Sequence, residues 1–282
     1  MTIHSSIDSL NLALFTFRQK KASVGLVPTM GALHRGHLEL VSQALAENEV
    51  VVVSIFVNPT QFNNPDDLTK YPRTLEEDTA LLANLNKNIV VFNPDATHLY
   101  EGAIQSKRYN FSGLEHEMEG KHRPGHFDGV GTVLNLLFRA VQPNKAYFGE
   151  KDFQQLQIVR KLTLIEKLPV TIVGCAIVRE SHGLAMSSRN QRLTKIQFEE
   201  AAIIYTILQE VRMKFDTLSV PGLIRLAEQR FSENSNFALE YFEISSETTL
   251  KPAQRKHKNN SYRAFVAAFA GEVRLIDNIA LN

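Results

Sequence analysis

The sequence predicts an α/β protein in which a doubly wound parallel sheet is followed by a second, smaller C-terminal α/β domain. Over the first two thirds of the chain, short apolar runs alternate with segments of helical periodicity, as in a parallel sheet wrapped by helices. Beyond about Val178 this order gives way to a Ser- and Arg-rich loop, two helices and three strands. The length of 282 residues favours two domains, although a single large α/β domain stays open.

The first two strands are expected at residues 24–28 and 50–57. Both are nearly continuous apolar runs rich in valine, which indicate strands covered on both faces. Between them, Leu38, Val41 and Ala44 recur at helical spacing. The chain therefore begins its sheet with a strand, a helix and a strand.

Further elements extend this pattern to about residue 177. Thr74 and Glu77 form a capping-box pattern at the start of a helix, and Pro143 ends a later one. The other elements expected here are strands at 88–92, 146–148 and 170–176 and helices over 130–141 and 153–162.

The C-terminal domain is expected to span 178–282, which leaves 1–177 for the first domain. Its predicted elements are helices over about 194–215 and 221–231 and strands at 238–244, 262–269 and 273–279. The three strands are close enough in sequence to pair antiparallel. The basic segment 251–260 is interpreted as a solvated loop.

Composition excludes several function classes. With 44% apolar and 22% charged residues, the chain falls in the ordinary globular range. A formal net charge of +1 provides no overall basic field that would recruit nucleic acid or an anionic membrane. Cys175 is the only cysteine, which excludes an intrachain disulfide. No secretory leader or spanning segment is recognisable, so we expect a cytoplasmic protein that binds neither nucleic acid nor membrane.

The most informative segment is PTMGALHRGHLELV, where the first strand gives way to a helix. A helix N-terminus at the carboxyl end of a parallel strand offers N–H groups and a positive dipole to phosphate. Gly31 and Gly36 allow close backbone approach, and His34 and His37 can donate hydrogen bonds to phosphate oxygens. Taken alone, the two histidines could equally be a metal pair or surface groups.

Their context favours phosphate. The H-x-G-H arrangement after a first strand resembles the HIGH-type signature of nucleotidyl-transferring enzymes related to class I aminoacyl-tRNA synthetases, which implies a Rossmann-like fold. That superfamily has a second, downstream loop rich in serine and basic residues, and Met186, Ser187, Ser188 and Arg189 match it. Hydroxyls and a guanidinium suit phosphate oxygens.

A third segment, FGEKDFQQ, lies between these two, again where a strand meets a helix. Gly149 permits close approach, Lys151 is a point charge for phosphate, and Asp152 could accept from a ribose hydroxyl or cap the helix. Gln155 and Gln61 could orient a hydroxyl and a carboxylate without adding charge.

With FVNPTQF, YPRT, RPGHFDGV, FGEKDFQQL, GLAMSSRN and the ending YFEI…RLIDN in order, the chain resembles the pantothenate synthetase (pantoate–β-alanine ligase) family along essentially its whole length. The resemblance implies an enzyme that joins pantoate to β-alanine. Pantoate first attacks the α-phosphate of ATP, giving pantoyl-adenylate and pyrophosphate. β-Alanine then displaces AMP.

The resemblance also implies site residues. Domain 1–177 would bind ATP and pantoate, and domain 178–282 would carry the phosphate loop and form a lid. Residues implied to bind ATP are Met30, Gly31, Ala32, Leu33, His34, Arg35, Gly36, His37, Gly149, Glu150, Lys151, Asp152, Val178, Met186, Ser187, Ser188 and Arg189. Residues implied to bind pantoate or β-alanine are Gln61, Gln155, Asn58, Tyr71, Arg123, Val130, Val133 and Leu134.

His37 is implied as proton donor, with His34 and Lys151 as the other catalytic residues. Mg²⁺ is expected on phosphates and water rather than in a protein cage, because no carboxylate cluster stands out. The family also implies a homodimer.

Two positions depart from the family pattern, and two other functions share part of that pattern. His182 stands where an aspartate is usual, and Leu136 where a lysine is common.

One rival function is that of a nucleotidyltransferase that makes a dinucleotide or CDP-alcohol, which the amides of FVNPTQF argue against. The other is that of a non-catalytic ATP-binding relative, which would have lost His34, His37 or Lys151.

Overall fold

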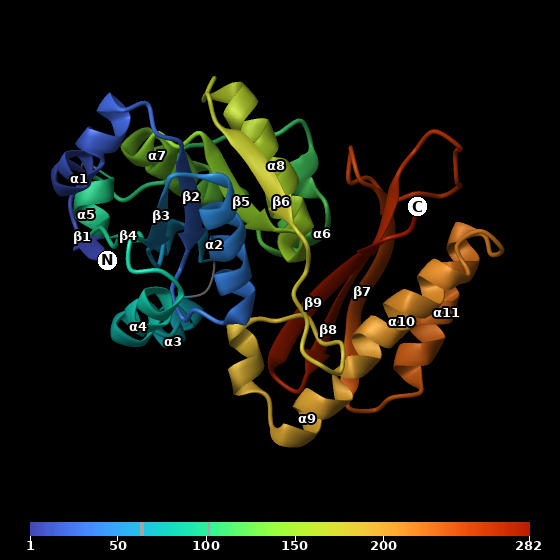
Figure 1. The fold of residues 1–282 in the computed structure, drawn as a ribbon. Helices are drawn as coiled ribbons and strands as arrows, with labels where there is room; N and C mark the ends of the chain where they lie inside the picture. The colour runs from blue at the N-terminus through green and yellow to red at the C-terminus, as the bar shows by residue number, and fades with distance from the viewer. Residues whose placement is uncertain (63–64, 101) are drawn as a thin grey trace. The chain divides into compact units, whose positions relative to one another are not determined.

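The computed structural model describes residues 1–62, 65–100 and 102–282 (Figure 1). They form two compact units. The first comprises Met1–Glu150 and Gln154–Ala176, and the second comprises Lys151–Phe153 and Ile177–Asn282. In the described ranges, no helix has both the length and the apolar composition needed to cross a bilayer.

The first unit contains a parallel sheet, as predicted, with β1 added to the five strands expected from the sequence. Its strands are β1 (Thr2–His4), β2 (Val24–Thr29), β3 (Val50–Ile55), β4 (Val90–Phe92), β5 (Lys145–Gly149) and β6 (Thr171–Cys175). Their order is β1-β4-β3-β2-β5-β6. All six residues of β3 are buried, because a central parallel strand is covered on both faces. The Rossmann-like α/β class is confirmed.

Helices surround this sheet. They are α1 (Ile7–Gln19), α2 (Arg35–Glu47), α3 (Pro65–Lys70), α4 (Leu75–Leu85), α5 (Ala96–Leu99), α6 (Met118–His122), α7 (His126–Val141) and α8 (Phe153–Ile165), with 3₁₀ turns η1 (Pro59–Gln61), η2 (Leu114–His116) and η3 (Glu150–Asp152). α1 packs beside α7, whereas α2 packs on β2, β3 and β5 and beside α4. No prediction covered α1 or β1, and β1 has only three residues from which to infer a strand.

The capping box predicted at Thr74 is wrong, although α4 starts where expected. The Thr74 side chain makes no capping bond, and its Oγ1 is buried without a hydrogen-bond partner. At ψ 46° the residue lacks the extended backbone that a capping side chain requires. Glu76, Glu77 and Asp78 instead place negative charge in the first turn.

The C-terminal end of α2 is tied to β5. The Glu47 carboxylate accepts hydrogen bonds from Lys145 Nζ at 2.8 Å and from the Tyr147 hydroxyl at 3.0 Å. Asn48 Nδ2 donates to the same hydroxyl at 2.7 Å. These bonds fix the end of α2 that lies farthest from its two histidines.

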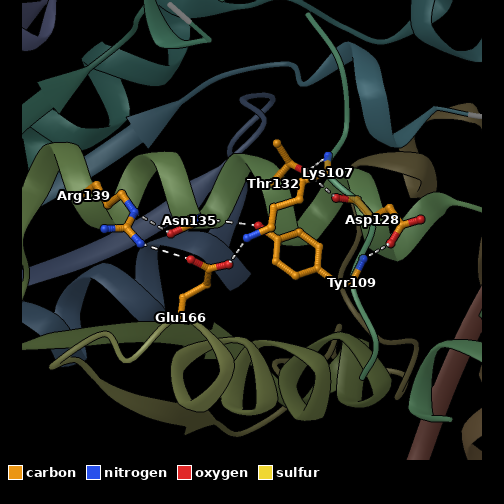
Figure 2. A network of polar contacts seen from close by, with 7 residues as sticks. All are labelled: Lys107, Tyr109, Asp128, Thr132, Asn135, Arg139 and Glu166. Carbon is orange, nitrogen blue, oxygen red and sulfur yellow. Dashed lines mark hydrogen bonds and ion pairs between the residues drawn. The ribbon is translucent and has the colours of Figure 1, made fainter. Parts of the chain in front are cut away.

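Figure 2 shows a polar network that ties an extended segment to α7 and α8. The Lys107 ammonium pairs with Glu166, which also pairs with Arg139 at 3.0 Å. The Lys107 backbone N–H donates to Thr132 Oγ1 at 2.8 Å, and the Tyr109 N–H donates to Asp128 at 2.9 Å. This network secures the solvent side of α7.

The second unit contains the predicted three-stranded antiparallel sheet, in the order β7-β8-β9. Its elements are β7 (Phe237–Ser246), β8 (Tyr262–Ala270), β9 (Val273–Ala280), α9 (Lys195–Glu200), α10 (Ala202–Met213), α11 (Val220–Ser232) and η4 (Ser188–Arg192). The single helix predicted over 194–215 is wrong, because it is interrupted at Ala201. There ψ is −12°, and the Ile204 N–H bonds to the Ala201 carbonyl three residues back, which tightens the chain to a 3₁₀ turn.

Candidate active site

The strand order of the first unit reverses between β2 and β5. From β2 the chain proceeds to β3 and β4 on one side, then returns to β5 on the other, where Leu26 pairs with Ala146. In open α/β sheets, ligands bind at the carboxyl ends of the strands that flank such a reversal. Two of the predicted phosphate segments follow these two strands.

The turn after β2 is strained and held by a buried carboxylate. Gly31 has φ 82°, and Ala32, which is not glycine, has φ 49°. Asp78 is buried, and its carboxylate accepts hydrogen bonds from the backbone N–H groups of Ala32 at 3.0 Å and Leu33 at 2.7 Å. Charge-assisted bonds of this kind hold a left-handed alanine that would otherwise be unfavourable. Asp78 carries no predicted role, because its partners lie 46 and 45 residues away.

His34 and His37 lie together at the start of α2. Their ring centroids are 4.1 Å apart, and both residues are half-buried. His34 Nδ1 accepts from the Gly36 N–H at 3.1 Å, and His37 Nδ1 accepts from the His34 N–H at 3.3 Å. Since a backbone N–H can only donate, each neutral ring carries its proton on Nε2. Two Nε2–H donors are thereby set at one helix end.

The other residues of this segment differ in exposure. Leu33 belongs to the apolar core between sheet and helices. Arg35 is exposed, and its Nε lies 3.9 Å from Glu39 Oε1. Met30 Sδ accepts from Gln61 Nε2 at 3.1 Å. The segment therefore reaches the predicted pantoate residues through Met30.

Asn58 and Gln61 form a buried amide pair around η1. Asn58 Nδ2 donates to Gln61 Oε1 at 3.1 Å and to the Gly129 carbonyl at 3.2 Å. Asn58 Oδ1 accepts from the Tyr100 hydroxyl at 2.6 Å. Asn58 is 1% exposed and Gln61 is 9% exposed, so the Asn58 amide contacts the Gln61 amide rather than solvent.

Arg123 and His126 also converge on Gln61. The Gln61 carbonyl accepts from His126 Nδ1 at 2.8 Å and from Arg123 Nη2 at 3.4 Å. Arg123 Nη1 lies 3.4 Å from His126 Nε2. No role was predicted for His126, although it lies inside the segment RPGHFDGV.

Helix α7 supplies an apolar wall behind these polar groups. Val130, Val133 and Leu134 are 2–6% exposed and share one face at helical spacing. α7 packs against η1, which carries Gln61. Tyr71 lies nearby in the chain fold, with its ring edge-on to Phe62 at 5.6 Å. The predicted pantoate residues of η1 and α7 are thus brought together.

Two consecutive glutamines on α8 have different environments. Gln154 is buried, and its amide bonds to the Leu114 and Glu117 carbonyls and to the Glu119 N–H at 2.7–3.0 Å. Gln155, the predicted ligand, is half-buried beside it. At the end of β5, a Cβ built on Gly149 would have no atom within 4 Å, so the backbone there is open to a ligand.

The second unit holds the downstream loop at the end of a small hairpin. The Met186 N–H donates to the Val178 carbonyl at 2.9 Å, and Arg179 forms a bridge with Ala185. The Ser187 side chain then accepts from the Arg189 N–H at 3.3 Å and caps η4. Ser187, Ser188 and Arg189 are half-buried.

Lys151 and Asp152 also belong to the second unit. The Lys151 carbonyl accepts from Asn278 Nδ2 at 2.8 Å. Lys151 is half-buried and Asp152 is exposed, while Glu150, the other residue of η3, belongs to the first unit. Across residues 1–62, 65–100 and 102–282, no three His, Cys, Asp or Glu side chains are grouped so as to hold a metal.

Comparisons with known proteins identify the family. The family model for pantoate-beta-alanine ligase matches residues 2–280. The pantothenate synthetase of Flavobacterium psychrophilum is 52% identical over 282 residues, covering 100% of each chain. The crystal structure of pantothenate synthetase from Thermus thermophilus has a TM-score of 0.89 at 39% identity, covering 100% of this chain and 99% of that one.

A further crystal structure is that of pantoate-beta-alanine ligase from Francisella tularensis, complexed with beta-gamma ATP and beta-alanine. Its TM-score is 0.81 at 37% identity, covering 100% of this chain and 98% of that one. Matches of this length and identity leave no part of either unit unaccounted for by the family. The chain belongs to the pantoate–β-alanine ligase family, also named pantothenate synthetases.

Proposed function

We propose that this chain condenses pantoate with β-alanine at the expense of ATP, through a pantoyl-adenylate. A pantoate carboxylate oxygen attacks the α-phosphorus and pyrophosphate leaves. The β-alanine amine then attacks the acyl carbon, AMP leaves with the bonding electron pair, and the amine loses a proton. The observation that carries the proposal is the pair of Nε2–H donors of His34 and His37 at the carboxyl end of β2.

The two histidines act on phosphate. Positioned N–H donors stabilise charge that develops on phosphoryl oxygens in the transition state. His37 is proposed as the proton donor, and His34 stabilises the α-phosphate. Their Nδ1 atoms already accept from backbone N–H groups, so Nε2 is the atom that carries the proton in each neutral ring.

The departing pyrophosphate is proposed to bind cationic and hydroxyl groups of the second unit. These groups are Lys151, Ser187, Ser188 and Arg189. The Val178 carbonyl is already used by Met186, so a nucleotide contact there would involve the Val178 N–H. Residues 178–282 are proposed to act as a lid, with ATP and pantoate bound by residues 1–177.

Pantoate is proposed to bind at Gln61 and Gln155, against the apolar wall of Val130, Val133 and Leu134. Gln61 presents its Nε2–H to a thioether, a weak acceptor that a carboxylate or hydroxyl oxygen could replace. Asn58 holds the Gln61 amide from behind. The amides can orient pantoate without adding a charge.

Mg²⁺, a homodimer and a cytoplasmic location complete the proposal. The Asp78 carboxylate is occupied by two backbone N–H groups, so it does not offer a hard cation an open oxygen pair. Mg²⁺ would therefore be held by ATP phosphates and water, where it would neutralise charge on the leaving group. ATP and β-alanine are the proposed co-substrates, and the complex of the Francisella tularensis enzyme with beta-gamma ATP and beta-alanine supports this choice.

The test is a turnover assay with purified protein, ATP and Mg²⁺. AMP, pyrophosphate and pantothenate are expected together only when pantoate and β-alanine are both present. AMP formed with another acid but not with pantoate would overturn the substrate assignment. A nucleotide product without AMP would indicate the nucleotidyltransferase alternative.

Variants of His37 test its role. His37→Asn retains an acceptor near the Nδ1 position for the His34 N–H but removes Nε2–H, so kcat should fall by about 10²- to 10⁴-fold. His37→Gln places an amide N–H near the Nε2 position and should recover part of this loss. His98→Asn, the same change at an exposed histidine, is the matched control. Equal kcat in His37→Asn and His98→Asn would exclude a catalytic role.

A further inference from the structure

Two neighbouring side chains on β9, Asp277 and Asn278, reach different parts of the second unit. They are 4% and 2% exposed, and they pair with Val266 and Phe265 of β8. Successive side chains of a strand point to opposite faces of the sheet. The Asp277 side chain therefore lies on one face of the sheet, and the Asn278 side chain lies on the other.

The Asp277 carboxylate holds the hairpin that precedes the serine-rich loop. Arg179 Nη1 donates to Asp277 Oδ2 at 2.6 Å, and Nη2 donates to Oδ1 at 3.0 Å. Arg179 Nη1 also donates to the Gly183 carbonyl at 3.0 Å, across the hairpin turn. The guanidinium carbon lies 3.6 Å from the centre of the Tyr205 ring. A planar guanidinium bonded on its edge and stacked on its face cannot rotate freely.

This ion pair is shielded from water. The side chains of Arg179 and Asp277 are 16% and 2% exposed. Burial raises the pKa of the Asp277 carboxyl, and the Arg179 guanidinium opposes that rise. Removing either partner would leave the other charge buried without compensation, so the two are mutually dependent.

The Asn278 amide holds the segment that carries Lys151. Its Nδ2 donates to the Lys151 carbonyl at 2.8 Å, and its Oδ1 accepts from Arg263 Nη1 at 2.6 Å. The Arg263 guanidinium lies 4.0 Å from the centre of the Phe153 ring, two residues beyond Lys151. The Lys151 segment is therefore tied to β9 by the hydrogen bond from Asn278 and to β8 by the contact between Arg263 and Phe153.

The contacts of Asp277 with the hairpin and those of Asn278 with the Lys151 segment are linked by a hydrogen bond within β9. The Asn278 backbone N–H donates to Asp277 Oδ1 at 2.7 Å, the same oxygen that receives Arg179 Nη2. β9 also lies against η4, which begins at Ser188. A shift of either side chain would therefore displace both the Arg179 hairpin and the segment that carries Lys151.

We propose that Asp277 and Asn278 are positioning residues that fix Lys151 and the Ser187–Arg189 loop relative to each other for binding the ATP phosphates. This inference rests on the proposed function, in which both segments bind those phosphates. One position of β9 holds the Lys151 segment, and the adjacent position holds the hairpin that leads into the loop.

The test measures ATP affinity without pantoate, so that no turnover occurs. Asn278→Asp keeps the size of the side chain and its acceptor for Arg263 but removes the donor to the Lys151 carbonyl. The Kd for ATP should rise roughly tenfold to a hundredfold, the loss typical of one misplaced charged contact. Asn259→Asp, the same change at an exposed asparagine, should leave the Kd unchanged.

A double-mutant cycle distinguishes positioning from a general structural effect. If Asn278 acts through Lys151, then Asn278→Asp should weaken ATP binding much less in a Lys151→Ala background. Full additivity of the two changes would overturn the inference. The KM values for pantoate and β-alanine should stay within about twofold in Asn278→Asp, because a positioning role affects only the phosphate contacts.

Asp277→Asn provides an independent test if Asn278→Asp does not fold. The amide side chain of this variant would retain one acceptor for Arg179. Asp277→Asn should weaken ATP binding much less in an Arg189→Ala background than in the unmodified chain. Asp216→Asn, the same change at an exposed aspartate, is the control. If Lys151→Ala and Arg189→Ala both bind ATP like the unmodified chain, the proposed function fails at these segments. If they weaken binding but Asp277→Asn and Asn278→Asp do not, only the positioning inference fails.

Discussion

Residues of the same type, close together in the chain, have different tasks in this protein. Gln154 uses both ends of its amide to hold backbone groups near η2 and α6, whereas Gln155 lies half-buried beside it. The Asn58 amide likewise forms its hydrogen bonds with other groups of the protein, namely Gln61, Gly129 and Tyr100. Such assignments depend on partners far away in the sequence, so a motif predicts that a residue matters without predicting what it touches.

Cys175 offers a test at this scale. Burial raises the pKa of its thiol to about 11, with smaller contributions from the charges of Glu47 and Glu150. At pH 8 about one thiol in a thousand would be ionised, and the thiolate is the reactive form. Iodoacetamide should therefore modify the native protein at least about a hundredfold more slowly than the denatured chain. Similar rates in the two states, followed by mass spectrometry, would contradict the buried environment of Cys175.

At the scale of elements, the contact between α7 and η1 positions the residues that are proposed to bind pantoate. A Cβ on Gly129 would lie 2.4 Å from the Thr60 carbonyl oxygen and 2.8 Å from the Gln61 Cα. Because both neighbours are backbone atoms, they cannot move aside as a flexible side chain could. The absence of a side chain at residue 129 lets the helix approach closely enough for its carbonyl to accept from Asn58.

Gly129→Ala should therefore separate α7 from η1. We expect a loss of about 1–3 kcal/mol in the free energy of unfolding, as for other overpacked sites, and a higher KM for pantoate. Gly222→Ala is the matched control, since its Cβ would meet two side-chain atoms at longer distances, the Ser219 hydroxyl at 3.3 Å and the Leu218 Cβ at 3.8 Å. Denaturant titration of both variants would measure the free energy of unfolding, and steady-state kinetics would measure the KM for pantoate. Equal stability and equal pantoate KM in the two variants would show that α7 can shift without consequence.

The interruption at Ala201 shows where element-scale prediction from sequence ends. The apolar periodicity continues across residue 201, so the pattern predicts one helix. The Thr194 and Gln197 side chains form a capping box that starts α9, and the turn then tightens at the fully buried Ala201. Boundaries of this kind arise from packing in the second unit's core and leave little trace in a hydrophobic pattern.

At the scale of the whole molecule, each of the two units contains a glutamate whose pKa is lowered by hydrogen bonds from neighbouring side chains. Hydrogen bonds from Lys145, Gln43 and Tyr147 lower the pKa of Glu47 in the first unit to about 2. Those from Arg230 and Lys214 lower the pKa of Glu210 in the second unit to about 2. Both glutamates would titrate near pH 4.3 in an unfolded chain.

These depressed pKa values predict acid sensitivity. A carboxylate whose pKa is lower in the folded state stabilises folding above its unfolded pKa, and this contribution is lost as pH falls from about 5 to about 2. Glu210→Gln should lower the unfolding temperature at pH 7 and approach the unmodified chain's value as the pH falls toward about 2. Glu228→Gln, at an exposed glutamate, is the control. A difference between Glu210→Gln and the unmodified chain that does not change with pH would refute the assignment.

The parallel sheet was predictable because valine-rich apolar runs specify buried strands, and the antiparallel C-terminal sheet was predictable because its three apolar runs are close in sequence. The placement of His34 and His37 at a strand end also followed from local pattern. Asp78 and His126 could not be inferred in this way, because their partners Ala32 and Gln61 are distant in sequence. The assignment of Lys151–Phe153 to the second unit likewise depends on side chains from β8 and β9.

Helix α2 is fastened at both ends by groups from other elements: Asp78 holds the turn that leads into it, and Lys145 and Tyr147 hold Glu47 at its far end. A helix constrained in this way loses its conformational entropy when the chain folds, not when a ligand arrives. The nucleotide binding proposed at its histidines should accordingly carry little entropic cost from this segment. More of the free energy of those contacts is then retained as binding free energy.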